Sequence, residues 1–153
     1  MLGKLTLIDM QIIIRKAHPS DFEQIYKLNR DELGYDYSAY RTERKLIRLL
    51  YSSTDMVYVA VIKGCVVGYI HACDYDTLYA PHLKNIMGLA VSSEHRRIGV
   101  GRMLIQAIEK WAIDTGADGV RLTSGTDREG AHLFYQSMGY KKERLHYSFK
   151  KLF

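Results

Sequence analysis

Apolar residues recur at helical spacing in two early segments of the chain. Ser20 and Glu23 stand at capping-box spacing where the first segment begins, so they favour a helix start there. The apolar positions of this helix are Phe22, Ile25, Tyr26 and Leu33. A β-type run, Met10 to Arg15, precedes it, and an amphipathic stretch over residues 41–51 predicts a second, shorter helix. We therefore expect the chain to begin with one strand and two helices.

The middle of the chain carries β-rich runs. Residues 56–62 and 65–73 flank a two-residue turn, Lys63 and Gly64, and this arrangement predicts a hairpin. Both runs are almost continuously apolar, so we expect both strands to be well buried. A fourth strand is predicted over residues 85–91.

Strands and helices alternate in the second half. A long helix is predicted from residues at helical spacing, namely Leu104, Ile105, Ile108, Trp111 and Ala112, with Gly116 as its stop. Residues 119–124 predict a fifth strand and residues 129–138 a fourth helix. Tyr147 and Phe149 alternate afterwards and predict one or two closing strands. Because the alternation is confined to this half, we expect a mixed sheet rather than a fully parallel one.

The composition is typical of one globular domain. The 153 residues are 47% apolar and 25% charged, and no linker or repeat interrupts them, so a single domain over residues 1–153 is expected. Cys65 and Cys73 lack partners at metal-ligand spacing, so we predict neither a disulfide framework nor a metal site. No apolar run reaches the ~18 residues of a membrane span. We expect a cytoplasmic protein with no membrane partner.

The charge balance gives a second reading. Lys and Arg number 22 against 17 Asp and Glu, a net charge of +5, which suits an anionic ligand or nucleic acid. A basic nucleic-acid-binding module is therefore the alternative from another class. The chain has no helix-turn-helix, zinc or RNP signature, and its basic residues form no single stripe, so we expect no specific nucleic-acid partner. The oligomeric state stays open, a homodimer included.

The turn before the long helix has the chemistry of an anion site. Gly99 and Gly101 allow the backbone to approach a ligand closely, and the helix start presents free N–H groups and the positive end of the dipole. Arg96, Arg97 and Arg102 add the positive charge that a diphosphate requires. The alternative is a glycine turn with solvated arginines.

Two other phosphate-binding motifs fit this turn poorly. It lacks the Gly-Lys-Ser/Thr ending of a P-loop, which argues against a nucleoside triphosphatase. Leu104 stands where a dinucleotide fingerprint has its third glycine, which argues against a Rossmann dehydrogenase.

Two motifs together carry a resemblance to a known family. The segment Arg96-Arg97-Ile98-Gly99-Val100-Gly101 follows the fourth strand, and the late helix reads Ala131-His-Leu-Phe134-Tyr135 before Gly139-Tyr140. This combination resembles the GNAT superfamily of acetyl-CoA-dependent N-acetyltransferases, and the resemblance covers nearly the whole chain from Met10. It implies an α/β GNAT fold with a mixed, mostly antiparallel sheet of six to seven strands and about four helices. The sheet would be split between the fourth and fifth strands to admit acetyl-CoA.

The resemblance also implies a set of cofactor-binding residues. The strand edge Leu89, Ala90 and Val91 would bind the pantetheine arm, and the N–H of Leu89 or Ala90 would stabilise the oxyanion. The turn would hold the pyrophosphate through Arg96, Arg97, Ile98, Gly99, Val100, Gly101 and Arg102.

The late helix supplies the remaining implied roles. Tyr135 would act as general acid for the leaving thiolate, with a structural tyrosine at the rim of the core as the alternative. Arg128 stands where many members have Asn, and a subgroup pairs Arg there with a His at the position of His132. Arg128 would then reach the cofactor phosphates and His132 would pack beside the pantetheine. A half-buried helix histidine is the alternative for His132.

The acceptor amine must lose a proton before it attacks, because an alkylamine has a pKa near ~10. Some relatives use a Glu just before the position of Leu89, but this chain has Gly88 there. The nearby candidates are Asp74, Asp76, His82 and Glu94, and the sequence selects none of them. The resemblance implies acetyl transfer to a primary amine of a small molecule by direct attack, without a metal. A peptide or ribosomal-protein N-acetyltransferase is the main alternative.

Overall fold

The computed structural model describes residues 11–153 and falls into two compact units, which meet between Arg121 and Leu122. The described residues contain one five-stranded sheet in the order β1-β2-β3-β4-β5. Its strands are β1 (Ile13–Lys16), β2 (Asp55–Ile62), β3 (Cys65–Thr77), β4 (Ala80–Val91) and β5 (Gly119–Leu122). The predicted count of six to seven strands is therefore wrong, while the α/β class is confirmed. The part of the first predicted strand at Met10 lies outside the described residues.

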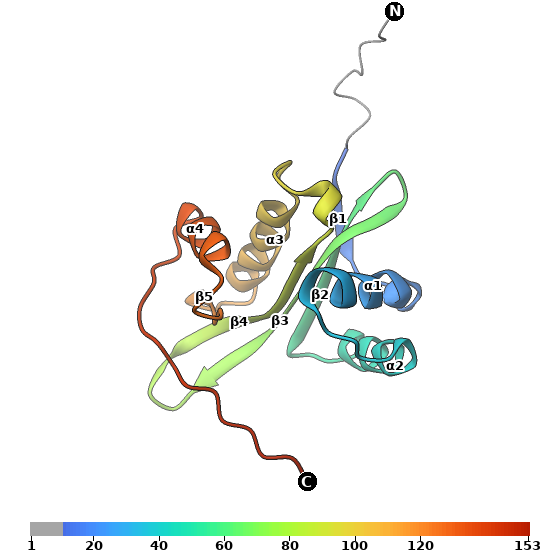
Figure 1. Cartoon of the computed structure of the whole chain (residues 1–153). Helices are drawn as coiled ribbons and strands as arrows, with labels where there is room; N and C mark the ends of the chain where they lie inside the picture. The colour runs from blue at the N-terminus through green and yellow to red at the C-terminus, as the bar shows by residue number, and fades with distance from the viewer. Residues whose placement is uncertain (1–10) are drawn as a thin grey trace, which may run out of the picture. The chain divides into compact units, whose positions relative to one another are not determined.

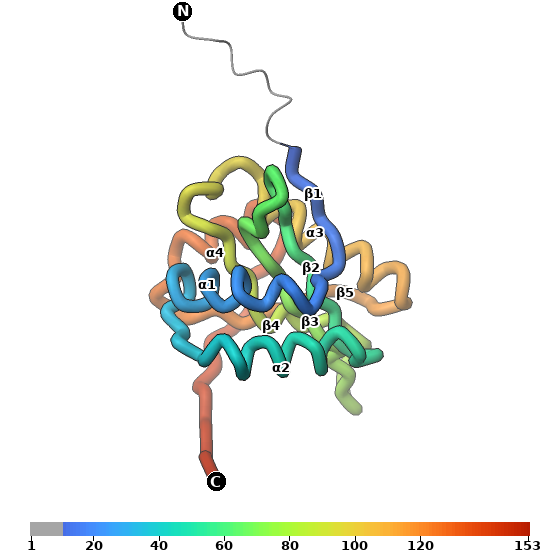
Figure 2. The backbone as a smooth tube through the Cα atoms, turned by 90° about the vertical axis from the view of Figure 1, so that its right-hand side faces the viewer, coloured from blue at the N-terminus to red at the C-terminus, as the bar shows by residue number. Residues whose placement is uncertain are grey.

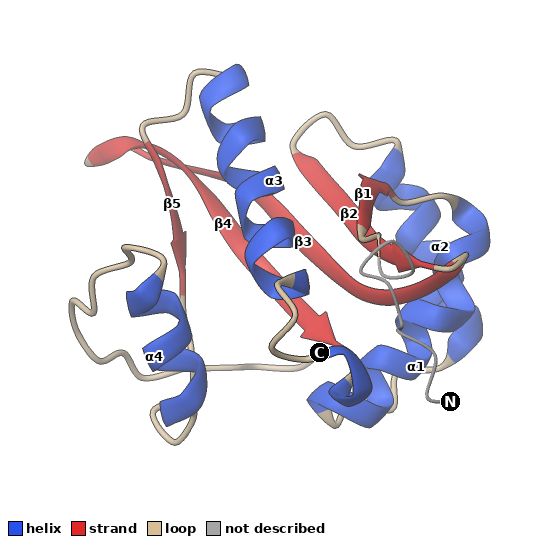
Figure 3. Ribbon diagram, turned by 90° about the horizontal axis from the view of Figure 1, so that it is seen from above, coloured by secondary structure: helices blue, strands red, loops and turns tan. Residues whose placement is uncertain are grey.

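The sheet is mixed, as the sequence predicts. Strands β1 to β4 pair antiparallel in chain order. The N–H of Asp118, just before β5, donates to the carbonyl of His82 at 2.8 Å, and Arg121 further along donates to Asn85. Residue numbers therefore rise together along β4 and β5, which makes this pair parallel, and the two arrows point the same way in Figure 3.

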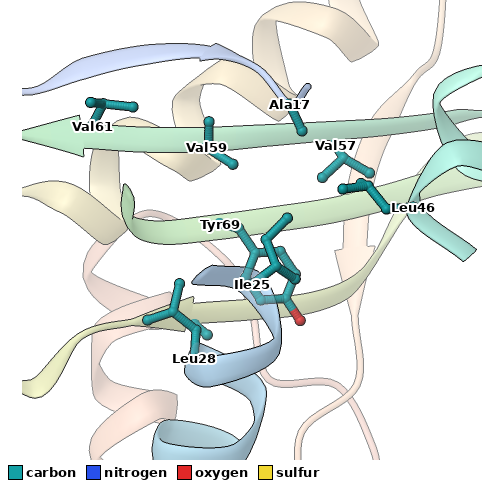
Figure 4. Close-up of a cluster of buried hydrophobic side chains, with 9 residues drawn as sticks. Ala17, Ile25, Leu28, Leu46, Val57, Val59, Val61 and Tyr69 are labelled. Carbon is teal, nitrogen blue, oxygen red and sulfur yellow. The ribbon is translucent and has the colours of Figure 1, made fainter. Parts of the chain in front are cut away.

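Helices cover both faces of the sheet in the first unit. Helices α1 (Phe22–Leu33) and α2 (Ala39–Leu50) lie on one face, and α3 (Val100–Asp114) lies on the other (Figures 1 and 2). On the α1 and α2 face, Ile25, Leu28 and Leu46 pack against the strands (Figure 4). The predicted apolar face of α3 is confirmed, with its residues Leu104, Ile105, Ile108 and Ala112 fully buried. Within residues 11–153, no helix is long and apolar enough to cross a bilayer.

Asp21 joins the first strand to the first helix. A 3₁₀ turn, Pro19–Asp21, leads into α1, and the Asp21 carboxylate accepts from the N–H of His18 at 2.7 Å. Both guanidinium N–H groups of Arg15 donate to the same carboxylate, at 2.7 and 2.9 Å. Asp21 therefore takes the N-cap position of α1 in place of the predicted Ser20, but its side chain bonds back to His18 and Arg15 and does not cap the helix.

The central hairpin forms as predicted, and a second hairpin follows it. Lys63 and Gly64 have φ of 49° and 77°, and two positive φ values fit a type I′ turn. Strand β3 continues to Thr77 and β4 begins at Ala80, so the strands predicted over residues 65–73 and 85–91 are longer than expected and join in a second hairpin. Its polar residues indicate a loop when read alone, but pairing such as Tyr75 with Leu83 overrides that local preference.

Gly68 allows α3 to begin close to the sheet. A Cβ at this position would lie 3.0 Å from the carbonyl oxygen of Ala90 and 3.1 Å from a methyl carbon of Val100. A larger residue would therefore push α3 away from the strands. Because Gly68 pairs with Val91, this packing brings the N-terminus of α3 to the C-terminal end of β4.

The second unit, residues 122–153, contains one helix, α4 (Glu129–Ser137). Residues 140–153 form neither helix nor strand, so the predicted closing strands are absent from this segment. Leu145, Tyr147 and Phe149 do alternate, but they are 76%, 92% and 94% exposed. An alternating pattern becomes a strand only when a neighbouring strand pairs with it, and this segment has no such neighbour.

Candidate functional site

A β-bulge interrupts β4 near its C-terminal end. His71 of β3 faces Gly88, but the next residue of β3, Ala72, faces Ile86. Met87 is therefore an extra residue on β4, and its side chain is exposed. Such bulges bend a strand and change the direction of the side chains that follow, and they are frequent next to active sites.

The predicted strand edge Leu89–Val91 follows this bulge directly. On one side it pairs with β3, through Ile70, Tyr69 and Gly68. On the other side β5 lies beside the first half of β4 and ends at Leu122 after four residues. Along this edge, the backbone N–H and C=O groups of alternate residues point away from β3. Because β5 ends earlier, it does not pair with these groups. An extended ligand can bind such an edge as another strand would.

The turn that follows has the geometry of an anion site. Arg97 and Gly99 adopt left-handed backbone conformations, with φ of 62° and 97°, and only glycine does so without strain. The first hydrogen bond of α3 runs from the N–H of Met103 to the carbonyl of Gly99, at 3.0 Å. The N–H groups that precede this bond belong to Val100, Gly101 and Arg102. They lie at the positive end of a 15-residue helix.

The three predicted arginines of the turn differ in their surroundings. Arg96 donates to a carboxylate oxygen of Glu32 in α1 at 2.8 Å, and the other oxygen of Glu32 accepts from the N–H of Ser93 at 2.9 Å. Arg96 therefore anchors the turn to α1. Arg97 and Arg102 are exposed and form no salt bridge within residues 11–153, so their charge is free to meet an anion. No motif marked Glu32, because its partners lie about sixty residues away in the sequence.

Three predicted residues lie in the second unit. Arg128 directly precedes α4, and His132 donates from Nε2 to the carbonyl of Gly125 at 2.9 Å, which holds the turn that starts the helix. The ring of Tyr135 is half-buried, 5.5 Å from Phe134 and 6.2 Å from Tyr140 between centroids. Burial raises the pKa of Tyr135, against a smaller opposing effect of the Arg128 charge. The phenol therefore keeps its proton at neutral pH, as a general acid must.

A cavity of about 130 Å³, partly open to solvent, lies between the sheet and the helices α1 and α2. Its apolar lining is Ile25, Leu46, Leu49 and Val57, and its polar lining is Asn29, Tyr37, Thr42, Lys45, Tyr69 and His71. The sequence analysis singled out none of the polar residues. Tyr69 and His71 are two apart on one strand, and strand periodicity alone indicates that they share a face. The polar lining residues that come from α1 and α2 show no comparable pattern in the sequence.

The polar groups of this cavity form two sets. The hydroxyl of Tyr69 donates to Asn29, and burial raises the pKa of Tyr69 to about 12. The Nζ of Lys45 lies 4.8 Å from the centre of the Tyr37 ring. At neutral pH these residues give the cavity a neutral phenol and a cation.

The second set is a histidine and a carboxylate. Nε2 of His71 lies 2.7 Å from Oδ1 of Asp55, and Asp55 also accepts from the hydroxyl of Ser52 at 2.7 Å. Burial opposes ionisation of Asp55, but the hydrogen bonds from Ser52 and His71 outweigh it and hold the pKa of Asp55 below its usual range. Asp55 is therefore a carboxylate behind the imidazole at neutral pH.

The four candidate acids and bases of the sequence analysis lie elsewhere. Asp74 bonds Lys84, and Nε2 of His82 lies 3.3 Å from the same carboxylate. The Nζ of Lys84 lies 3.9 Å from the centre of the Trp111 ring of α3, so this group is on the face opposite the cavity. Asp76 and Glu94 are exposed. The structure brings none of the four to the cavity.

Comparison with known proteins gives relatives in one family. A model of the acetyltransferase (GNAT) family matches residues 22–140. N-acetyltransferase 8 of Homo sapiens is 39% identical over 87 residues, which cover 56% of this chain and 38% of that protein. The chain thus spans less than half the length of this relative. An N-alpha-acetyltransferase of Sulfurisphaera tokodaii is 29% identical over 142 residues, covering 86% and 81% of the two chains.

The fold is also shared with solved structures. The aminoglycoside N-acetyltransferase AAC(6')-Iy in complex with CoA superposes with a TM-score of 0.83 at 17% identity, over 94% of this chain and 97% of that one. This likeness concerns the fold alone. The resemblance read from the two sequence motifs is confirmed, because the family model matches from residue 22 to residue 140 of the 153. The chain therefore belongs to the acetyltransferase (GNAT) family.

Proposed function

We propose that the chain is an N-acetyltransferase that moves an acetyl group from acetyl-CoA to a primary amine of a small molecule. The observation that carries this proposal is the junction of β4 and α3. An open strand edge, Leu89–Val91, leads there into a left-handed glycine turn with unpaired helix N–H groups. The contact at Gly68 supports the same conclusion, because it keeps the strand edge and the helix start next to each other.

The cofactor-binding roles follow from this junction. The edge Leu89–Val91 offers the pantetheine arm those backbone groups that turn away from β3, and the N–H groups from Arg97 to Arg102 bind the pyrophosphate. Arg97 and Arg102 neutralise its charge. Arg96 acts indirectly, because its salt bridge with Glu32 holds the turn in shape.

The chemistry is direct transfer. Acetyl-CoA supplies the activated acetyl group as a thioester. The N–H of Leu89 or Ala90 stabilises the charge that develops on the carbonyl oxygen as the amine attacks. Tyr135 protonates the leaving thiolate, which its family motif and its raised pKa support. From the same motif we infer that Arg128 contributes to phosphate binding and that His132 packs beside the pantetheine, with only its second ring nitrogen available.

The acceptor is proposed from the cavity beneath α1 and α2. A volume of about 130 Å³ fits a short aliphatic amine, and the apolar lining would bind its hydrocarbon part. Lys45 gives this cavity a positive charge, which favours an amine that also carries an anionic group. A second candidate is the N-terminus of a peptide, favoured by the similarity to two N-alpha-acetyltransferases over 86% of the chain.

We also infer that both units form one acetyltransferase domain over residues 1–153. The family match supports this inference, because it runs from residue 22 through residue 140 and thus through both units. A cytoplasmic location stays a prediction from the sequence.

An acceptor panel tests the proposal. Purified protein is assayed for CoA release with acetyl-CoA and alkylamines, amino acids, polyamines, aminophosphonates, an aminoglycoside and short peptides, and acetyl-CoA affinity is measured by calorimetry. We expect transfer to at least one small amine. Preferred transfer to peptide N-termini would replace the small amine with a peptide. Tight, salt-dependent nucleic-acid binding without any transfer would contradict the enzymatic function.

A further inference from the structure

His71 lies in the cavity and is supported by a carboxylate from the neighbouring strand. Val57 pairs with His71 across β2 and β3, and Asp55 is two residues from Val57 on the same face of β2. His71 and Asp55 are therefore diagonal neighbours, and their side chains are only 19% and 16% exposed. Their bond of 2.7 Å is thus shielded from most of the solvent.

This bond determines which ring nitrogen can accept a proton. Asp55 is a carboxylate and can only accept, so Nε2 of His71 carries hydrogen and donates to it. The lone pair of the neutral ring is then on Nδ1. Within residues 11–153 nothing hydrogen-bonds to Nδ1, and His71 lines the cavity. The imidazole therefore has a free basic nitrogen.

His71 is also next to the proposed site of acetyl transfer. Its partner across the strands is Gly88, the residue before Leu89. Cross-strand neighbours have Cα atoms about 4.5–5.5 Å apart, so His71 lies within one side-chain length of the Leu89 backbone. A Cβ at Gly88 would be 3.4 Å from the hydroxyl of Tyr69, which places position 88 on the cavity face. Because Gly88 has no side chain there, no group from this position separates the cavity from Leu89.

We propose that His71 is the general base that deprotonates the acceptor amine and that Asp55 positions it. The proposal rests on the acetyltransferase function above and names the base for that reaction. Nδ1 takes one proton from the ammonium group of the acceptor, and the imidazolium is stabilised by Asp55. The amine lone pair then forms the bond to the acetyl carbon as the carbon–sulfur bond breaks. The nitrogen loses its second proton as the amide forms, and this proton replaces the one that Tyr135 gives to the leaving thiolate. His71 returns the first proton to the solvent, so one proton is released per amide formed.

Other charged and titratable groups face His71 from the elements packed around it. Asp55 comes from β2, Tyr69 from β3, and Lys45 from α2, with Tyr37 in the segment before α2. Asp55 stays a carboxylate and Tyr69 stays neutral over the range of an activity assay, since the pKa of Asp55 is lowered and that of Tyr69 is about 12. Neither of these two groups therefore changes its charge between pH 6 and 9.

The test compares two amines in the native protein and in His71→Gln. With an ordinary alkylamine, the variant should lose about 100-fold or more of kcat/KM at neutral pH, the scale of positioned proton transfer. Its kcat/KM should then rise about tenfold per pH unit toward the pKa of the amine, because only neutral amine reacts. With trifluoroethylamine, which is already neutral at pH 7, the variant should keep most of its activity. Acetyl-CoA affinity by calorimetry should not change.

Two further variants separate the roles. Asp55→Asn keeps the shape but removes the charge and no longer holds the ring hydrogen on Nε2, so it should lower kcat/KM for the alkylamine by about tenfold or more, up to the loss in His71→Gln. The matched control is His82→Gln, which changes a second histidine beside an aspartate on the opposite face of the sheet. This control should leave both activities at the native level.

The outcomes distinguish the base from the acetyltransferase function. Loss with the alkylamine and retention with trifluoroethylamine support His71 as the base. An equal loss with both amines at unchanged acetyl-CoA affinity, or a native pH profile in His71→Gln with chemistry rate-limiting, overturns it and leaves the proposed function intact. If the native protein acetylates neither amine nor any other acceptor, the proposed acetyltransferase function is contradicted. The role of His71 as its general base is then contradicted as well.

Discussion

The junction of β4 and α3 and the cavity beneath α1 and α2 are built in different ways. At the junction the functional groups are backbone N–H and C=O, and the residues from Leu89 to Arg102 form one continuous segment. In the cavity they are side chains from α1, α2, β2 and β3, spread from Asn29 to His71. A backbone site leaves a compact trace in the sequence, because it needs glycine at fixed places. A side-chain site leaves little trace until the fold brings its members together.

The largest effect is expected from Tyr135→Phe, which affects neither the junction nor the cavity. Positioned proton transfer typically contributes about 10²–10⁴-fold, so kcat should fall by this factor while acetyl-CoA affinity stays unchanged. Steady-state and single-turnover kinetics with calorimetry check this. Full activity with chemistry rate-limiting would reduce Tyr135 to a packing residue.

Gly101→Val tests the junction alone. A β-branched side chain at the helix start keeps the ligand away from the N–H groups, so acetyl-CoA affinity should fall about tenfold or more, as loss of charge-assisted hydrogen bonds implies. The KM for the acceptor should change little. Gly116→Ala, at the other end of α3 with a φ of 75°, is the control. Gly116→Ala should lower thermal stability without weakening acetyl-CoA binding. An unchanged acetyl-CoA affinity in Gly101→Val would show that the turn is not part of the binding site.

Lys45→Met tests the cavity alone. The substitution keeps the aliphatic stem and removes the charge above Tyr37. Preference for amines that carry an anionic group over plain alkylamines should fall about fivefold, the effect of ~1 kcal/mol for a solvent-accessible charge pair. Acetyl-CoA affinity should stay the same. A fall in that affinity instead would mean that the two regions are not independent.

The smallest effect on activity is expected from Asp21→Asn, which lies outside both regions. Burial disfavours the charge on Asp21, but the hydrogen bonds from Arg15 and His18 outweigh it and lower the pKa of Asp21. A lowered pKa in the folded state adds stability that is complete above the unfolded pKa of about 4 and is lost as pH falls below it. Denaturation across pH should show a smaller acid destabilisation in Asp21→Asn. Neutral stability should fall by about 1–3 kcal/mol.

The same contrast explains how much the sequence predicted. The turn at Lys63 and Gly64 and the apolar face of α3 depend on local pattern, and both lie at the residues where the sequence predicted them. The second hairpin and the unpaired segment after Tyr140 depend on whether a partner strand is present, which local pattern does not reveal. In the site, the glycine turn was readable. Glu32 and His71 were not, because their partners lie far away along the chain or are revealed only by strand register.

A binding site made of backbone N–H groups also has consequences for mutational tolerance. Every amino acid except proline carries that donor, so at an exposed position such as Arg102 most substitutions keep the N–H and alter only the surrounding charge. Saturation mutagenesis of the turn should therefore show a sharp intolerance to proline at Arg102 beside wide acceptance of other residues. At Gly99 the pattern reverses, because a φ of 97° penalises every side chain almost regardless of its chemistry. Gly99 and Arg102, two positions of the same turn, would thus tolerate substitutions in opposite ways although both contribute to binding one ligand.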